Sequence, residues 1–281
     1  MRYSKIKSYA KVNLVLNVVG KTPSLHKIES IVAFVDLHDV ILIKSIKSKK
    51  HNISFSGKFS SNISKKNTIS NLLEILEKKK LLNNKKFKIK INKQIPNKAG
   101  LGGVSMNAAS ILKYFIKKKI IKINKKKILE ISKLAGSDVI LGLNSKNLIL
   151  SSSNKIKYFK KCKKFYTLIV KPNFGCSTKE IYSKVRKFNK PKIRKPVKNM
   201  FDLNYLKKKN NSLEQIALSK YPKLKSIKLY LESLSNSVFV RMTGSGSALV
   251  AYFQSKDGCL NAEKMFNKKY KNYWCIASKT I

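Results

Sequence analysis

Glycine and serine residues in one segment of the chain could bind a phosphate-bearing ligand. The segment IPNKAGLGGVSMNAASIL places Gly100, Gly102, Gly103 and Ser105 between a predicted strand and a predicted helix. Glycine has no Cβ, so its backbone N–H groups can curl around an anion, and a helix N-terminus adds partial positive charge. The expected ligand is a polyphosphate. The alternative is that the glycines only form a tight turn between strand and helix, which needs glycine for positive φ. The segment is neither a Walker A motif nor a good dinucleotide fingerprint.

The positive charge of the chain is spread rather than clustered. The 281 residues include 62 Lys or Arg and 13 Asp or Glu, which gives a formal net charge of +49. Sites that read bases favour Arg, and RNA sites favour exposed aromatic residues interleaved with Arg. Neither pattern is present, because the few arginines are the scattered residues Arg2, Arg186, Arg194 and Arg241. We expect a solvated lysine surface whose field attracts anionic small molecules, and no specific nucleic-acid partner.

The N-terminus and the cysteines indicate a cytoplasmic protein. The opening residues lack a long apolar region and a small-residue cleavage site, and no stretch approaches the roughly 18 apolar residues of a membrane span. Neither secretion nor a membrane partner is therefore expected. Cys162, Cys176, Cys259 and Cys275 are scattered, with no CxxC pair. This spacing favours reduced thiols over a zinc site or a disulfide framework.

The first half of the chain predicts strands and helices on both sides of the glycine segment. Hydrophobic residues make up 43% of the chain, enough for a sizeable core. Alternation of apolar and polar residues predicts strands at 5–20 and 87–95. A second β-rich stretch at 28–43 is one strand, or two strands about a turn at 36–39. Helical periodicity is found at 67–80, with Asn67 or Thr68 as the N-cap, at 107–121 and at 128–134.

The second half predicts a further mixture of strands and helices. Ser151 to Asn154 is the best candidate boundary, so we expect lobes at 1–155 and 156–281. Strands are predicted at 165–170, 238–242 and 248–253, and an amphipathic stretch covers 212–233. Because helices and strands are interleaved in each half, the fold class is α+β.

Three separated segments stand out as motifs: AKVNLVLNV at 10–18, PNKAGLGGVSMNAA at 96–109 and MTGSGSALVAYF at 242–253. In sequence, order and spacing they resemble the motifs of the galactokinase, homoserine kinase, mevalonate kinase and phosphomevalonate kinase (GHMP) superfamily. Within the superfamily the chain is most similar to the members that phosphorylate a cytidine-diphosphate-linked methylerythritol. Four features carry this likeness: the AKVNL opening, the histidine of PSLHKIES followed by VDLHD, GSDV at 136–139, and NSLE with YP at 211–222.

The resemblance implies a fold, a reaction and a set of partners. The fold would have two lobes, an N-terminal one like the second domain of ribosomal protein S5 and a C-terminal ferredoxin-like one. ATP would lie on the glycine segment, and its γ-phosphoryl group would move, with Mg²⁺ present, to the 2-hydroxyl of the methylerythritol in the non-mevalonate isoprenoid pathway. A monomer or a weak homodimer would act on these small molecules. A kinase of another alcohol, such as homoserine or mevalonate, and a catalytically weak nucleotide-binding relative are the alternatives.

The resemblance also implies roles for individual residues. Asp138 would accept or orient the proton of the acceptor hydroxyl, and Lys11 would sit near it and counter the charge of the transferred group. Asn13, on the same face of its strand as Lys11, would bind substrate with His26, Asp138 and Thr178. Ser105 would reach phosphate or Mg²⁺, with a simple N-cap as the alternative. The nucleotide-binding residues would be Asn67, Pro96, Lys98, Gly100, Leu101, Gly102, Gly103, Ser105 and Gly244.

The chain departs from the family pattern at a few positions. Val104 replaces a glycine and Met106 a serine of the usual loop, and Leu25 stands where the family commonly has a tyrosine before the histidine. A β-branched residue cannot readily take positive φ, so either Val104 is tolerated in another conformation or the phosphate geometry differs. Without the tyrosine ring, an aromatic platform for the cytosine is missing from position 25. After Asp138, Ile140 replaces the usual proline.

Overall fold

The computed structural model describes residues 2–23, 25–61 and 63–281, and these residues form two compact units. The first unit consists of Met1–Ala10, Leu37–Pro96 and Gly102–Ser145, and the second of Lys11–Asp36, Asn97–Leu101 and Lys146–Ile281. The chain passes from one unit to the other within two long strands, β1 (Ser4–Lys21) and β2 (His26–Ile46). The division is therefore discontinuous in sequence, and a lobe boundary near residue 155 stays a prediction.

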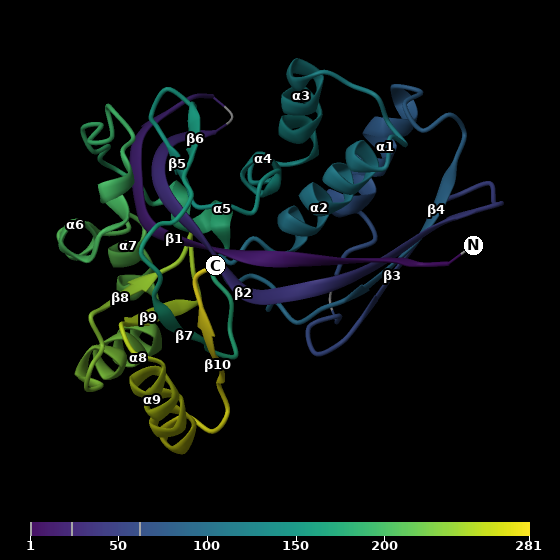
Figure 1. Cartoon of the computed structure of the whole chain (residues 1–281). Helices are drawn as coiled ribbons and strands as arrows, with labels where there is room; N and C mark the ends of the chain where they lie inside the picture. Colours follow the sequence, from purple (N-terminus) through teal and green to yellow (C-terminus); the bar gives the residue numbers. More distant parts are fainter. Residues whose placement is uncertain (1, 24, 62) are drawn as a thin grey trace. The chain divides into compact units, whose positions relative to one another are not determined.

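In the first unit, strands pair beside a layer of helices. Strand β4 (Lys86–Asn92) pairs antiparallel with the end of β2 and parallel with β3 (Asn52–Ser56). Helix α1 (Thr68–Lys78) contacts both α2 (Gly103–Lys117) and α3 (Lys125–Ala135), as Figure 1 shows, and α4 (Val139–Gly142) follows. Burial of their apolar residues builds one core, which includes Ile41, Ile43, Leu72, Leu76, Ile89, Ile91, Ile111, Phe115 and Ile131.

Helix α1 shows how the sequence sets these elements. The Asn67 side chain accepts hydrogen bonds from the backbone N–H groups of Ile69 and Ser70, and the Ser70 hydroxyl accepts one from the Asn67 N–H. This capping box fixes the first turn. Apolar residues spaced three and four apart then face the core. The expected N-cap at Asn67 is confirmed.

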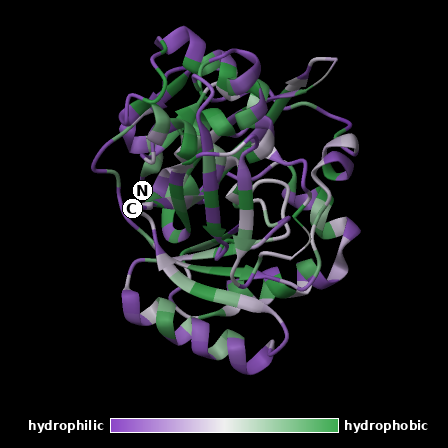
Figure 2. Ribbon diagram, turned by 90° about the vertical axis from the view of Figure 1, so that its right-hand side faces the viewer, coloured by the Kyte–Doolittle hydropathy of each residue, from purple (hydrophilic) through white to green (hydrophobic). Residues whose placement is uncertain are grey.

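The second unit contains an antiparallel sheet covered by helices. Its strand order is β10 (Trp274–Lys279), β7 (Tyr166–Lys171), β9 (Leu249–Phe253) and β8 (Phe239–Met242). Helix α9 (Lys256–Lys269) contacts β7, β9 and β10, and α8 (Pro222–Ser233) contacts β8 and β9. In Figure 2, hydrophilic and hydrophobic residues alternate along α9, the lowest helix, as expected for a helix with one buried face.

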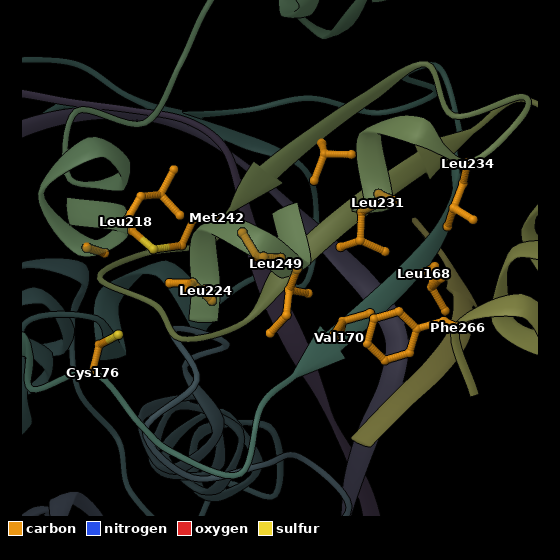
Figure 3. Close-up of a cluster of buried hydrophobic side chains, with 14 of the residues drawn as sticks. Leu168, Val170, Cys176, Leu218, Leu224, Leu231, Leu234, Met242, Leu249 and Phe266 are labelled. Atoms are coloured by element: carbon orange, nitrogen blue, oxygen red, sulfur yellow. The ribbon is translucent and has the colours of Figure 1, made fainter. Parts of the chain in front are cut away.

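Shorter elements complete the second unit. They are β5 (Leu148–Leu150), β6 (Ile156–Tyr158), α5 (Thr178–Ser183), a 3₁₀ turn (Lys198–Phe201), α6 (Leu203–Lys207) and α7 (Glu214–Lys220). Strand β5 pairs antiparallel with Ser30 to Val32 of β2 and with β6. Leucine, valine and phenylalanine side chains of the sheet and helices interlock in the core drawn in Figure 3.

Residues 28–43 lie in the single strand β2, so the one-strand alternative is confirmed and no turn interrupts residues 36–39. Asp39 is fully buried in this strand. The amphipathic stretch at 212–233 is two helices, since Pro222 occupies the first position of α8 and cannot continue α7. Helix α2 begins at Gly103, four residues before the predicted start at Asn107, and so takes in part of the glycine segment. Among the helices of the described residues, none has the length and apolar content to span a bilayer.

Candidate active site

Lys11 and Asn13 lie together in the second unit. They are alternate residues of β1, so both side chains leave the same face of the strand. Both are almost fully buried, with 4% and 3% of their surface exposed. The Lys11 Nζ donates to the Asn13 Oδ1 over 2.6 Å. The strand thus presents an ammonium group and an amide as one hydrogen-bonded unit.

Thr243 connects this strand to the glycine segment within the same unit. Its Oγ1 accepts a hydrogen bond from the Asn13 N–H at 3.1 Å and donates to the carbonyl oxygen of Gly100 at 3.1 Å. The backbone N–H of Lys11 donates to the carbonyl oxygen of Leu101. Parts of all three sequence motifs therefore meet here.

Close packing explains why Gly100 must be glycine. Its φ is +72°, and a Cβ on it would lie 2.0 Å from the carbonyl oxygen of Thr243. The N–H groups of Ser247 and Ala248 donate to the carbonyl oxygens of Lys98 and Ala99. The third motif therefore packs against residues 97–101, and it also forms the connection between the antiparallel strands β8 and β9.

Asn211 holds the third motif from the other side. Its Nδ2 donates to the carbonyl oxygens of Met242 and Gly244 at 2.8 and 2.7 Å, and its Oδ1 accepts from the Leu213 N–H. Gly244 has a φ of +56°, which favours glycine. The NSLE segment at 211–214 therefore holds the backbone of the third motif through Asn211.

In the first unit, the glycine segment forms the first turn of α2. Gly102 is the N-cap with a φ of 72°, and no side chain caps the helix. The first backbone N–H groups of a helix have no intrahelical partner, so they are available to an anion. Val104 is the second helical residue and is absent from the positive-φ residues of the described chain, so its β-branched side chain is tolerated. Ser105 is the third helical residue, so the alternative that it is the N-cap of this helix is wrong.

A buried ion pair that the sequence analysis missed lies beneath this turn. Asp39 and Lys93 have no exposed side-chain surface and form a salt bridge. Asp39 also accepts hydrogen bonds from the backbone N–H groups of Gln94 and Ile95 and from the Asn107 side chain. Burial lowers the pKa of Lys93, and Asp39 opposes that shift. The Lys93 Nζ lies 3.0 Å from the place of a Cβ on Gly103, so a side chain at 103 would meet the ammonium group.

Asp138 and Asn67 also belong to the first unit. Asp138 is partly exposed and precedes α4, and its side chain makes no capping hydrogen bond to that helix. Asn67 uses its amide in the cap of α1 and also donates to the Ser64 carbonyl oxygen. Because Lys11 lies in one unit and Asp138 in the other, their pairing stays a prediction.

The other predicted residues differ in how accessible their side chains are. Thr178 begins α5, and its hydroxyl lies 2.9 Å from that of Ser245 in the third motif. Lys98 is exposed, Pro96 and Leu101 are buried, and Lys98 has a φ of 51°. Among the described residues no group of three or more His, Cys, Asp or Glu side chains could hold a metal ion. The role of Ser105 toward Mg²⁺ is thus untested.

His26 lies among aromatic rings of the second unit. Its ring centroid is 4.9 Å from that of Tyr182 and 6.3 Å from that of Phe188. Burial and, to a smaller extent, Lys21 lower the pKa of the imidazole. Leu25 is 60% exposed and Phe188 47% exposed. An aromatic surface beside His26 is therefore present, although it comes from residues 182–188 and not from position 25.

Comparisons with known proteins identify the fold and the family of the chain. Residues 67–150 match the family model described as GHMP kinases N terminal domain. The fold is shared with solved kinases. A 4-(cytidine 5'-diphospho)-2C-methyl-D-erythritol kinase superposes with a TM-score of 0.77 at 20% identity, covering 99% of this chain and 100% of that one. A homoserine kinase from Cytophaga hutchinsonii has a TM-score of 0.72 at 14% identity, covering 100% and 95%. The chain has the two-lobed α+β fold of a GHMP kinase.

Relatives in sequence define the family more narrowly. A 4-diphosphocytidyl-2-C-methyl-D-erythritol kinase of Pelagibacter ubique is 58% identical over 281 residues, the full length of both chains. One from Clostridium tetani is 31% identical over 286 aligned positions, covering 99% of this chain and 100% of the relative. The chain belongs to the family of 4-diphosphocytidyl-2-C-methyl-D-erythritol kinases.

Proposed function

We propose that the protein transfers the γ-phosphoryl group of ATP to the 2-hydroxyl of 4-diphosphocytidyl-2-C-methyl-D-erythritol. The full-length similarity to a curated kinase of that name carries the proposal. The geometry supports a phosphate-binding role, because α2 begins with uncapped N–H groups and the glycine segment packs tightly at Gly100 and Gly103. The same proposal places the protein in the cytoplasm, acting on small molecules as a monomer or a weak homodimer.

The residues of the chain divide the work of the reaction. The α2 N-terminus holds the phosphates of ATP, and the buried Lys11 ammonium counters negative charge on the transferred group. Asp138 takes the proton of the acceptor 2-hydroxyl. As it does so, the 2-hydroxyl oxygen bonds to the γ-phosphorus of ATP, and the bond between that phosphorus and the oxygen that leaves with ADP breaks. Ser105, in the first turn of α2, would hold Mg²⁺ with the phosphates. The metal ion would supply charge neutralisation.

The cytidine end of the acceptor would lie at His26. An imidazole can hydrogen-bond the base, and the rings of Tyr182 and Phe188 offer apolar faces beside it. Thr178 contributes a hydroxyl to the same unit, paired with that of Ser245.

An acceptor panel tests the proposal. ADP release in a coupled assay should require Mg²⁺ and the diphosphocytidyl methylerythritol, and homoserine and mevalonate should give no turnover. Lys11→Met and Asp138→Asn should each lower kcat by about a hundredfold or more. The exposed Lys7 of β1 and Asp257 of α9 supply matched controls, and Lys7→Met and Asp257→Asn should retain activity. Turnover on a different acceptor, or full activity of either site variant, would contradict the proposal.

A further inference from the structure

A chain of buried hydrogen bonds runs from Lys11 to a backbone carbonyl group of the same strand. The Lys11 Nζ donates to Asn13 Oδ1 at 2.6 Å, the Asn13 Nδ2 donates to Ser30 Oγ at 2.8 Å, and the Ser30 hydroxyl donates to the Val15 carbonyl oxygen at 2.6 Å. Ser30 lies on β2 and is 1% exposed. Every member belongs to the second unit.

The direction of this chain is fixed from the carbonyl end. A carbonyl oxygen has no proton, so it can only accept, and the single hydroxyl proton of Ser30 must point to it. The Ser30 oxygen is then left as an acceptor, and Asn13 must turn its NH₂ group toward it. The amide oxygen consequently faces the Lys11 ammonium. The two ends of an asparagine amide have nearly the same shape, so hydrogen-bond partners decide which way it points.

Lys11 acts in the same sense at the other end of the amide. Its ammonium group can only donate, so it must face the amide oxygen and not the NH₂ group. An amide rotated by half a turn would place its NH₂ against the Lys11 ammonium, donor against donor, and would leave the Ser30 oxygen facing another acceptor. Both of these unfavourable contacts would be buried, where a polar group without a hydrogen-bond partner costs free energy.

We infer that Ser30 is a positioning residue of phosphoryl transfer, which sets the Asn13 amide so that its oxygen holds Lys11. The inference rests on the proposed function, because it gives Ser30 no task except through Asn13 and Lys11. Ser30 itself donates to the main chain and accepts from Asn13. Without its hydroxyl, the amide loses the partner that selects its orientation, and the ammonium loses a fixed acceptor for part of the time.

A double-mutant cycle on kcat tests this role. Ser30→Ala should lower kcat about tenfold and change the KM for ATP by less than about twofold, because the ammonium is misplaced while the phosphate loop is intact. In an Asn13→Ala background the same substitution should change kcat by less than about twofold, since no amide is left to orient. A merely structural serine would cost the same in both backgrounds.

Further variants separate the possible failures. Ser30→Thr keeps the hydroxyl and should recover most of kcat. If Ser30→Ala lowers the melting temperature severely, Ser30→Cys replaces it in the cycle, and the same fall in kcat is expected. Ser132 supplies the matched control, because it is fully buried on α3 and its hydroxyl donates to the Ile128 carbonyl oxygen at 2.7 Å. Ser132→Ala should leave kcat unchanged. An undiminished kcat in Ser30→Ala, or an equal loss in both backgrounds, overturns the inference, whereas an active Lys11→Met variant overturns the role of Lys11 in the proposed function.

Discussion

The hydroxyl oxygen of Thr243 lies 3.1 Å from the carbonyl oxygen of Gly100, a residue 143 positions earlier in the chain. The same hydroxyl accepts the N–H of Asn13, 230 positions away. One side chain therefore holds together the three segments that carry the family motifs, and its removal should affect all of them.

Replacing Thr243 by valine tests that linkage. Val has the same shape but no hydroxyl, so Thr243→Val leaves the Gly100 carbonyl and the Asn13 N–H without their partner, at a cost of about 1–3 kcal/mol. We expect lower stability to urea and a KM for ATP raised by roughly three- to tenfold, since 1.4 kcal/mol corresponds to a factor of ten. Thr243→Ser keeps the hydroxyl and should behave like the parent. Equal values for both variants would contradict the linkage.

Gly100→Ala should disrupt the phosphate loop. The new Cβ would lie 2.0 Å from the Thr243 carbonyl oxygen at a φ of +72°, so the backbone must move. We expect ATP binding, measured by calorimetry, to weaken by more than about tenfold. Gly20 is the control, because a Cβ there would meet nothing closer than Lys27 Cδ at 3.6 Å. Gly20→Ala should bind ATP normally, and a similar loss in both variants would argue against a local effect.

The ion pair of Asp39 and Lys93 should show strong coupling in stability. Lys93→Met leaves a buried carboxylate without its counter-charge, and breaking a buried pair in this way costs about 3–5 kcal/mol. Adding Asp39→Asn should recover part of the loss. The Asn107 Oδ1 is buried without a hydrogen-bond partner, so a rotated Asn107 amide could accept from the new NH₂ group. Urea unfolding of the single and double variants measures the effect, and a double variant less stable than Lys93→Met would refute it.

His51 should make the protein less stable in mild acid. Its Nδ1 accepts the Phe87 N–H at 3.0 Å, which requires an unprotonated nitrogen. Burial lowers the pKa of His51 from its usual value of 6.5, while Glu77 opposes the shift. The folded state therefore binds the proton less readily than the unfolded chain. The stability from this residue is complete above pH 6.5 and is lost as the pH falls from 6.5 toward the lowered folded-state pKa.

His51→Asn keeps an acceptor near Nδ1 but cannot titrate. The fall in unfolding free energy between pH 7.5 and 5, measured in urea at about half-unit steps, should be shallower in this variant. His26, whose pKa burial also lowers, should account for part of the remaining slope. Parallel curves for parent and variant would show that His51 does not contribute.

Phe188 should contribute to the affinity for the acceptor if the cytidine lies beside His26. Stacking on an aromatic ring contributes roughly 1–3 kcal/mol per base, so Phe188→Ala should raise the KM for the acceptor by about five- to hundredfold. The KM for ATP should not change. Val197 is also apolar and 42% exposed in the second unit, and Val197→Ala is the control. An unchanged acceptor KM in Phe188→Ala would place the base elsewhere.

The sequence predicts the elements better than the side-chain network. The sequence located β1, β4, β7, β8 and β9, the first two by alternation, and Asn67 marked the start of α1, because these signals act within a few residues. The same alternation carries information about Lys93. It follows Phe87, Ile89 and Ile91 on the inward face of the strand pattern, so period two places it in the interior. Its partner Asp39 falls at the possible turn of residues 36–39, which the sequence leaves open.

Contacts between distant segments could not be predicted in this way. Ser30, Thr243 and Asn211 have no local pattern that distinguishes them, since their partners lie 17, 230 and 31 residues away. Only the folded chain brings these groups within hydrogen-bond distance. Val104 shows the opposite case: a departure that suggested a changed loop lies in an ordinary helical turn, because α2 starts one residue before it.

The orientation of the Asn13 amide begins at the carbonyl oxygen of Val15. That oxygen belongs to the main chain, and all twenty amino acids supply it equally. Evolution can therefore change the side chain at position 15, within the limits of packing, and leave the polarity of the neighbouring amide as it is. The orientation that directs the Asn13 amide oxygen to Lys11 therefore depends on a main-chain group that no substitution at position 15 removes.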